Sequence, residues 1–171
     1  MSAADLGEES FDALYRECVA DVYGYALSLL GDRASAEDVT ALAFERLLRA
    51  RRRLDLRRGS PRALLFTIAR NAALDELRRR KRRPDAGSAA AESLAAAPAG
   101  VEEVERRDSV RRALAGLSPR EREIVLLKFH GQLTNAELAR AMGISESNAG
   151  TRLHRALERL RESPLGAREV A

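Results

Sequence analysis

The sequence is poor in the residues that most enzymes, secreted proteins and membrane proteins need. Its 171 residues include one cysteine, two histidines, four phenylalanines and no tryptophan. Because Cys18 is the only cysteine, an internal disulfide and a cysteine-based zinc site are excluded. The apolar runs are a few residues long, whereas a transmembrane helix needs about 20. The first residues are acidic and lack the basic start and apolar run of a secretory signal. We therefore expect a cytoplasmic protein without a metal or other cofactor.

The two histidines do not form a catalytic constellation. His130 is expected at the end of one helix and His154 within another, and neither is accompanied by clustered acids or a glycine-rich phosphate loop. An enzyme acting on nucleic acid is therefore disfavoured. We expect the protein not to be an enzyme.

Charge is abundant in the sequence, and it is segregated. Residues 1–50 hold 10 acidic and 4 basic side chains, whereas residues 51–83 hold 13 basic and 3 acidic ones. Six consecutive basic residues, 78–83, close the second block. An arginine-rich composition explains the number of basic residues but not their clustering. The basic block indicates contact with a polyanion, and the acidic block indicates a different partner.

Apolar residues recur at helical spacing through the first half of the chain and predict three helices. Gly31 is expected to end the first, and Ser35 to cap a second at 35–52. After a short loop, Ser60 followed by a proline predicts the start of a third helix at 60–80.

The next segment, residues 84–100, loses this periodicity. Small residues dominate it and two prolines interrupt it, which predicts a flexible linker. No strict alternation of apolar and polar residues predicts a strand anywhere. We expect an all-α protein with two small helical domains, at 8–83 and 101–163, joined by that linker.

Two capping boxes mark the starts of helices in the second domain. In each box, two residues accept hydrogen bonds with their side chains from one another's backbone N–H groups. Ser118 and Glu121 start one helix, which Gly131 is expected to end. Thr134 and Glu137 start the next one.

The last two predicted helices have the spacing of a helix-turn-helix, at 135–154. Ala139 permits a close helix crossing, Gly143 makes the turn, and Ser145 caps the final helix. The outward positions of that helix carry short hydrogen-bonding side chains followed by arginines. Such side chains suit base edges and phosphates of the major groove. An ordinary helical hairpin is the alternative, but it would not require so many coincident signals.

Longer stretches of the chain resemble a known family. Residues 116–161, GLSPREREIVLLKFHGQLTNAELARAMGISESNAGTRLHRALERLR, resemble region 4 of bacterial RNA polymerase sigma factors. Three segments of the first domain resemble sigma region 2: FDALYRE at 11–17, AEDVTALAFERLL at 36–48 and LLFTIARNAALDELRRRKRR at 64–83. With only these two regions, the chain resembles the extracytoplasmic-function (ECF) class of the sigma-70 family. The resemblance implies a sigma factor that binds core RNA polymerase and directs promoter-specific initiation at −10 and −35 elements.

The resemblance also implies three contact surfaces, an anti-sigma factor as a further partner, and no membrane contact of the chain's own. The residues implied for polymerase binding are Glu37, Asp38, Phe44 and Glu45. Those implied for the melted −10 element are Arg57, Arg58, Arg62, Arg70, Asn71, Arg78 and Arg79. Those implied for the duplex −35 element are Ser145, Ser147, Asn148, Thr151, Arg152 and Arg155.

Two departures from the family pattern and two alternatives bear on these roles. Ala41-Leu42 stand where the family usually has Gln-Glu in the polymerase-binding helix, and Gly150 stands where lysine is usual. Asp75 and Arg78 could form only an intrahelical ion pair rather than meet DNA. The alternative function is a helix-turn-helix transcriptional regulator that does not form holoenzyme.

Overall fold

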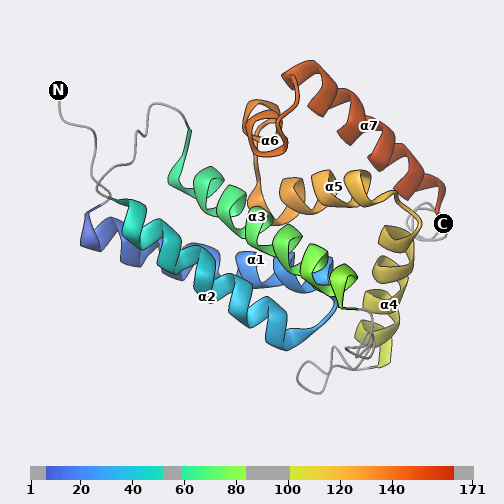
Figure 1. Cartoon of the computed structure of the whole chain (residues 1–171). Coiled ribbons are helices and arrows are strands. Elements are labelled where there is room, and N and C mark those ends of the chain that lie inside the picture. Colours follow the sequence, from blue (N-terminus) through green and yellow to red (C-terminus); the bar gives the residue numbers. More distant parts are fainter. Residues whose placement is uncertain (1–6, 52–58, 84–100, 164–171) are drawn as a thin grey trace.

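The computed structural model describes residues 7–51, 59–83 and 101–163. These described residues form seven α-helices and no strand, which confirms the expected all-α fold. The predicted linker, 84–100, lies outside them. The helices are α1 Glu8–Leu30, α2 Arg33–Ala50, α3 Pro61–Arg82, α4 Val101–Ala115, α5 Pro119–Gly131, α6 Asn135–Met142 and α7 Glu146–Glu162 (Figure 1).

The turn between α1 and α2 is tighter than the sequence suggested. Gly31 ends α1 in the left-handed conformation, as expected, with φ of 77°. Ser35 was predicted to cap α2, and this is wrong: Asp32 is the cap, and its carboxylate accepts a hydrogen bond from the Ser35 N–H at 2.9 Å. Because the Asp32 carboxylate satisfies the free N–H of Ser35, the helix begins at Arg33, earlier than predicted.

Arg80 fastens the end of α3 to this turn. Its guanidinium donates to the Leu30 carbonyl at 2.8 Å and to the Ser35 hydroxyl at 2.7 Å, and pairs with Asp32. One member of the six-residue basic run therefore holds the first domain together. The pKa of Asp32 is lowered: burial alone would raise it, but bonds from Ser35 and Arg80 outweigh that effect.

In the second domain both predicted capping boxes are present, Ser118 with Glu121 and Thr134 with Glu137. The expected end of α5 is displaced by one residue. Gln132, with φ of 55°, takes the left-handed position, while Gly131 remains helical. A Cβ at Gly131 would lie 3.0 Å from the side chain of Leu133 and 3.2 Å from the ring of Phe66. The glycine is thus required by a close approach of α3 rather than by its backbone angle.

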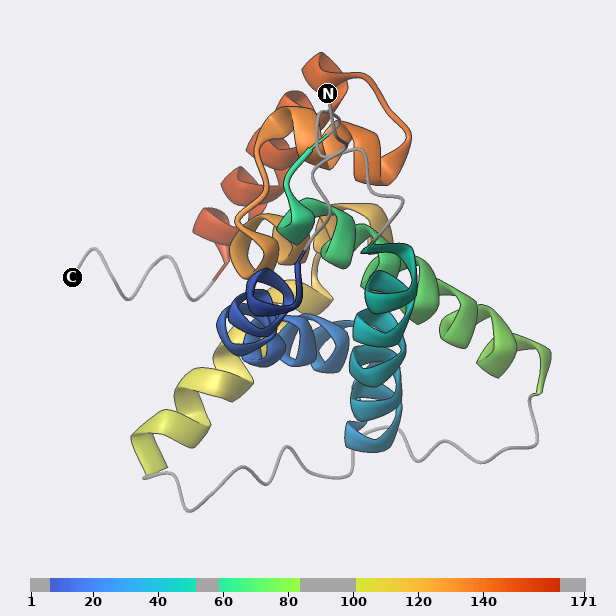
Figure 2. The same cartoon turned by 90° about the vertical axis from the view of Figure 1, so that its left-hand side faces the viewer.

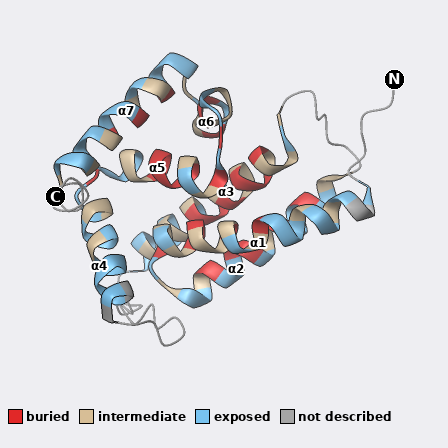
Figure 3. Cartoon of the chain, turned by 180° about the vertical axis from the view of Figure 1, so that it is seen from behind, coloured by how far each residue is buried: buried red, intermediate tan, exposed pale blue. Residues whose placement is uncertain are grey.

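The two domains share one hydrophobic core, which no local sequence signal predicted. Buried residues of α1, α2 and α3 form a single cluster with buried residues of α5, α6 and α7. In Figure 1, α5 lies between α7 and the first three helices, and the buried residues in Figure 3 gather where α3 and α5 meet. Figure 2 shows α4 projecting from this body. None of the described helices is long and apolar enough to cross a membrane.

Candidate nucleic-acid interface

The helix-turn-helix is formed by α6 and α7, as predicted. Gly143 turns the chain with φ of 67°, and the N–H of Ile144 donates to the Ala139 carbonyl at 3.0 Å. Ser145 then caps α7, where its hydroxyl accepts from the Asn148 N–H at 3.2 Å. Both ends of the turn are fixed by hydrogen bonds, so α7 is held at a defined angle.

One face of α7 is buried and the other is exposed. Ala149, Leu153 and Ala156 anchor the helix in the core. Arg155 is exposed, and Arg152 is half-buried with its Nε donating to the Asn148 amide oxygen at 2.7 Å. That bond orders Asn148 and Arg152 side by side. The remaining predicted −35 residues are all exposed: Ser145, Ser147 and Thr151.

Gly150 lies within α7 against the start of α6. A Cβ at this position would lie 3.5 Å from the Asn135 amide nitrogen, an ordinary van der Waals distance. The structure therefore has room for a side chain here, and the close packing of α6 on α7 does not require glycine.

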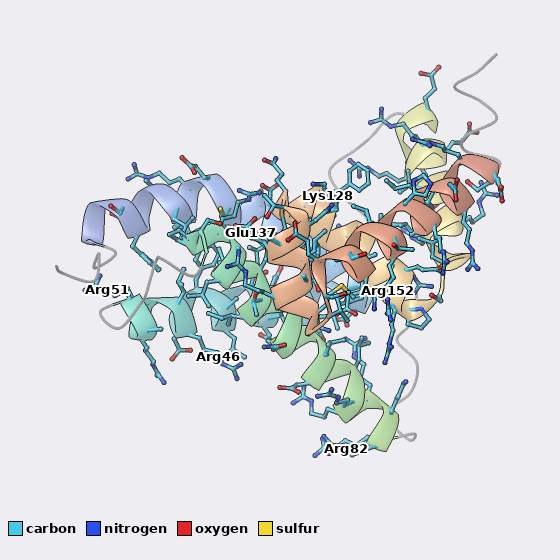
Figure 4. All side chains as sticks on the ribbon, turned by 90° about the horizontal axis from the view of Figure 1, so that it is seen from above. Arg46, Arg51, Arg82, Lys128, Glu137 and Arg152 are labelled. Atoms are coloured by element: carbon cyan, nitrogen blue, oxygen red, sulfur yellow. The ribbon has the colours of Figure 1, made fainter. Side chains whose placement is uncertain are left out.

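The predicted −10 residues of α3 lie on two sides of the helix. Asn71, nine positions after Arg62, points to roughly the opposite side of a helix with 3.6 residues per turn. Asn71, Arg78 and Arg79 are exposed. Arg78 pairs with Asp75 at 3.1 Å, with both side chains about two-thirds exposed, so this ion pair is weak and leaves the guanidinium accessible. Arg82 lies at the free end of α3, far from Arg152 of α7 (Figure 4).

Arg62 faces the second domain instead. Its Nε donates to the Gly131 carbonyl at 2.7 Å, and its terminal nitrogen donates to the His130 carbonyl at 2.7 Å and to Asp21 at 2.6 Å. The guanidinium also lies 5.4 Å from the centre of the Phe66 ring. Arg62 thus binds the carbonyl end of α5, which carries the negative end of the helix dipole.

Arg70 also contacts the second domain, through an ion pair with Glu123 of α5. The two side chains are only 16% and 8% exposed, so the pair is largely removed from water. At the start of α3, Ser60 donates to the Glu137 carboxylate of α6 at 2.7 Å. Bonds from Thr134 and Ser60 lower the pKa of Glu137 although burial alone would raise it. Sequence reasoning missed Glu123 and Glu137 as partners of α3.

Arg57 and Arg58 lie outside the described residues. Of the four predicted −10 arginines that the structure describes, the second domain engages Arg62 and Arg70, whereas Arg78 and Arg79 are exposed, as is Asn71.

Two of the four predicted polymerase-binding residues, Glu37 and Phe44, line a groove between α1 and α2. The groove has a volume of about 430 Å³, and Tyr15, Tyr23, Glu37 and Phe44 are among the residues that line it. Glu37, Asp38 and Glu45 are exposed, but Phe44 is only 5% exposed. Its ring packs edge-on against that of Tyr15, which is 45% exposed. Phe44 thus forms the floor of the groove, and Tyr15 forms its wall.

The described residues contain no group of histidine, cysteine or acidic side chains that could hold a metal ion. Cys18 is buried, and burial raises the pKa of its thiol. It is therefore a packed side chain beside Arg62 rather than a reactive thiolate.

Comparisons with known proteins identify the family of each domain. The family model described as Sigma-70 region 2 matches residues 14–83, and that described as Sigma-70, region 4 matches residues 107–160. The ECF RNA polymerase sigma factor SigL of Mycobacterium tuberculosis is 36% identical over 154 residues, which cover 87% of this chain and 85% of SigL.

Two solved structures have a similar fold. The sigma factor RpoE in complex with the anti-sigma factor NepR from Bartonella quintana superposes with a TM-score of 0.73 and 24% identity, over 90% of this chain and 96% of RpoE. CnrH in complex with the cytosolic domain of CnrY gives 0.66 and 23%, over 94% of this chain and 90% of CnrH.

Proposed function

Because this chain belongs to the ECF class of the sigma-70 family and is a promoter-directing RNA polymerase sigma factor, we propose that each of its three surfaces binds a different partner during initiation. The α1–α2 groove binds core polymerase, α3 with the segment before it binds the −10 element, and α7 reads the −35 element. The observation that carries this proposal is the exposed, ordered polar face of α7 on a rigidly capped helix-turn-helix.

For the −35 element, α7 has the shape and chemistry of a major-groove reader. Asn148 and Arg152 lie one turn apart and are joined by a hydrogen bond, and Arg155 follows on the exposed side. Asparagine suits adenine and arginine suits guanine, each with a bidentate pair of bonds. We assign sequence reading to these three side chains and backbone positioning to Ser145, Ser147 and Thr151.

For the −10 element, the outward side of α3 supplies Asn71, Arg78 and Arg79. Arginines near a helix end suit phosphate contacts, which fix the register of the strand without reading its sequence. Arg80 is excluded from this role because it is committed to Leu30, Asp32 and Ser35. Arg62 and Arg70 can join the −10 surface only when the second domain releases them.

For polymerase, the groove offers an apolar floor at Phe44 and an acidic side chain at Glu37, and Asp38 and Glu45 are exposed on the same helix. This combination fits a partner helix that carries both apolar and basic side chains. Ala41 is exposed and lines the groove. Its side chain is smaller than the glutamine that is usual in the family at this position, which makes the groove deeper here.

A run-off transcription assay with core polymerase tests the proposal and separates it from the alternative of a regulator that does not form holoenzyme. Templates would be taken from genomic footprints of polymerase bound with this chain. Initiation that depends on both the chain and the template supports the proposal. Binding of the same duplexes without initiation would support the regulator instead.

Site-specific variants then assign the surfaces. Glu37→Lys should abolish initiation and co-elution with core polymerase while leaving duplex binding intact. Glu105→Lys on α4, an equally exposed site with the same change of charge, is the matched control. Loss of both activities in Glu37→Lys would contradict the assignment of the groove.

We also propose a protein inhibitor as a further partner, a cytoplasmic location and the absence of enzymatic activity. The support for an inhibitor is that RpoE and CnrH, which share this fold, were each solved with a bound partner. A candidate inhibitor should suppress run-off transcription when it is mixed with the chain before core polymerase, and a mixture that transcribes normally would eliminate that candidate.

A further inference from the structure

A glycine in the interior of α7 is not explained by the folding of that helix. Gly150 lies well inside α7, where glycine disfavours a helix relative to alanine. Its backbone is helical, so no left-handed turn requires it. A Cβ there would meet its nearest neighbour at 3.5 Å, so packing does not require glycine either. The use of glycine that remains is to let another molecule approach the backbone closely.

Gly150 lies on the side of α7 that we assign to the DNA backbone. It follows Ser147 by three positions, and residues three apart are neighbours on the surface of a helix. It follows Asn148 by two positions, which places it on roughly the opposite side of a helix with 3.6 residues per turn. The bare backbone of Gly150 therefore borders a positioning residue and lies away from the base-reading residues.

The amide of Asn135 lies beside this bare backbone. Asn135 is the first residue of α6, and its side chain is exposed. Its amide nitrogen is the atom that a Cβ at Gly150 would meet at 3.5 Å. Within the described part of the chain, no hydrogen bond occupies the Asn135 side chain. Asn135 thus offers a free N–H donor where α6 meets α7.

A phosphate oxygen suits this donor better than a base edge does. In a helix-turn-helix the first helix crosses the DNA backbone while the second lies in the major groove. The major groove is about 12 Å wide and a helix with its side chains is about 10–12 Å across, so the sides of α7 lie close to the sugar-phosphate walls. A position without a side chain lets one wall come nearer, within reach of the Asn135 amide.

We propose that Gly150 and Asn135 form a phosphate site at the −35 element. A DNA strand lies against the bare backbone of Gly150, and the Asn135 amide donates a hydrogen bond to one of its phosphate oxygens. The proposal rests on the assignment of α7 to the −35 element. Because the site joins two helices, it fixes the angle at which α7 enters the groove. Because a phosphate carries no sequence information, the site strengthens binding to every duplex equally.

Two substitutions act on the phosphate site from its two helices. Asn135→Ala removes the donor and leaves the capping box of α6 intact. Gly150→Leu fills the space over the backbone, and leucine favours the helix. Each has a matched control outside the helix-turn-helix: Ser10→Ala on α1 removes an exposed polar side chain, and Ala115→Leu on α4 adds an apolar one at an exposed position.

The probes are two duplexes of about 20 base pairs, the length of a typical protein site. One is a random-sequence pool, and the other is the duplex that the full unmodified chain enriches from that pool. Affinity is measured by fluorescence anisotropy at constant ionic strength, because salt alters every phosphate contact. Thermal unfolding of each variant reports whether it folds.

We expect Asn135→Ala and Gly150→Leu each to weaken binding about tenfold, the loss expected for a hydrogen bond to a charged group. Both duplexes should be affected by the same factor. The double variant should bind no more weakly than the weaker single variant, because both substitutions disable one contact. Ser10→Ala and Ala115→Leu should bind as the unmodified chain does.

Unchanged affinity in Asn135→Ala would overturn the phosphate site. A double variant whose loss is the product of the two single losses would overturn it as well, and so would a loss confined to the enriched duplex, since Asn135 would then read a base. If Gly150→Leu fails to fold, Asn135→Ala, at an exposed position, decides the question alone. A chain that enriches no duplex contradicts the proposed role of α7, whereas one that enriches a duplex and binds it equally well without the Asn135 amide contradicts the phosphate site alone.

Discussion

The two proposed DNA-contacting helices differ in how accessible their basic side chains are. On α7, Arg155 is exposed and Arg152 is partly so, and the neighbouring hydrogen bond merely orders them. On α3, Arg62 and Arg70 are bound across the domain interface by acceptors of α5, and Arg62 also pairs with Asp21 of α1 within its own domain. The two helices thus present one open surface and one half-covered surface.

This difference teaches that a basic helix is not by itself a DNA-binding surface. The arginines of α3 are satisfied either by phosphate or by the chain's own carboxylate and carbonyl groups, since both offer negative acceptors. Which partner prevails depends on the competing free energies, not on the residue type. Four predictions test whether the covered side of α3 and the exposed face of α7 respond independently to change.

Phe66→Ala should have the largest effect, because Phe66 is fully buried on the covered side of α3. Its ring packs edge-on against Tyr25, and Gly131 of α5 lies against it. Truncation of a buried phenylalanine costs about 3–5 kcal/mol, which urea unfolding measures. Phe129→Ala is the matched control, since Phe129 is 64% exposed, and it should change stability by less than about 0.5 kcal/mol. Equal losses from the two substitutions would contradict the shared core.

Arg155→Ala should weaken specific duplex binding by about 1–3 kcal/mol and relax the preference for one base pair. Because Arg155 is exposed, the variant should lose affinity for the duplex without losing folding stability. Arg161→Ala, at an exposed site in the last turn of the same helix, is the control and should leave the base preference intact. A uniform loss across all sequences in Arg155→Ala would indicate a phosphate contact instead of base reading.

The local signals of the sequence predicted the second domain's helices closely. The capping boxes at Ser118 and Thr134 each join residues three apart, so the sequence itself contains both partners. The cap at Asp32 was missed because Ser35 carries the same kind of signal, and only the tertiary contact with Arg80 shows that the Ser35 hydroxyl has another partner.

The candidate site was less predictable because its decisive contacts join distant residues. Arg70 and Glu123 lie 53 positions apart, and Arg62 and Gly131 lie 69 apart. Neither helical periodicity nor motif spacing relates such positions. Sequence reasoning placed Arg62 and Arg70 on a DNA surface from charge and family resemblance, and that role stays a prediction.

The two glycines of the helix-turn-helix should respond in opposite directions. Gly143→Ala places a Cβ in the left-handed conformation, where φ is 67°, and should cost about 1–2 kcal/mol. Gly150→Ala meets only an ordinary contact with Asn135 and should stabilise α7 by up to about 1 kcal/mol. Thermal unfolding of the two variants checks both signs. Destabilisation by Gly150→Ala would mean that α6 and α7 pack more closely than this structure shows.

Mild acidification should have the smallest of these effects. It should weaken the packing of α5 over α3 and leave the exposed face of α7 unchanged. Burial against α1 lowers the pKa of His130, although the nearby Asp21 carboxylate, which Arg62 also binds, opposes this shift. The contribution of neutral His130 to the closed arrangement is therefore fully present above its ordinary pKa of about 6.5 and declines as the pH falls below it.

The radius of gyration, followed from about pH 7.5 to pH 5.5, reports this opening, because that interval spans the ordinary titration of histidine. His130→Gln cannot gain the proton, so it should flatten the profile. His154→Gln, at an exposed histidine of α7 that lies 3.2 Å from Glu158, should leave the profile as it is. If His130→Gln and the unmodified chain expand alike, protonation elsewhere opens the domains, and the covered side of α3 is not controlled by His130.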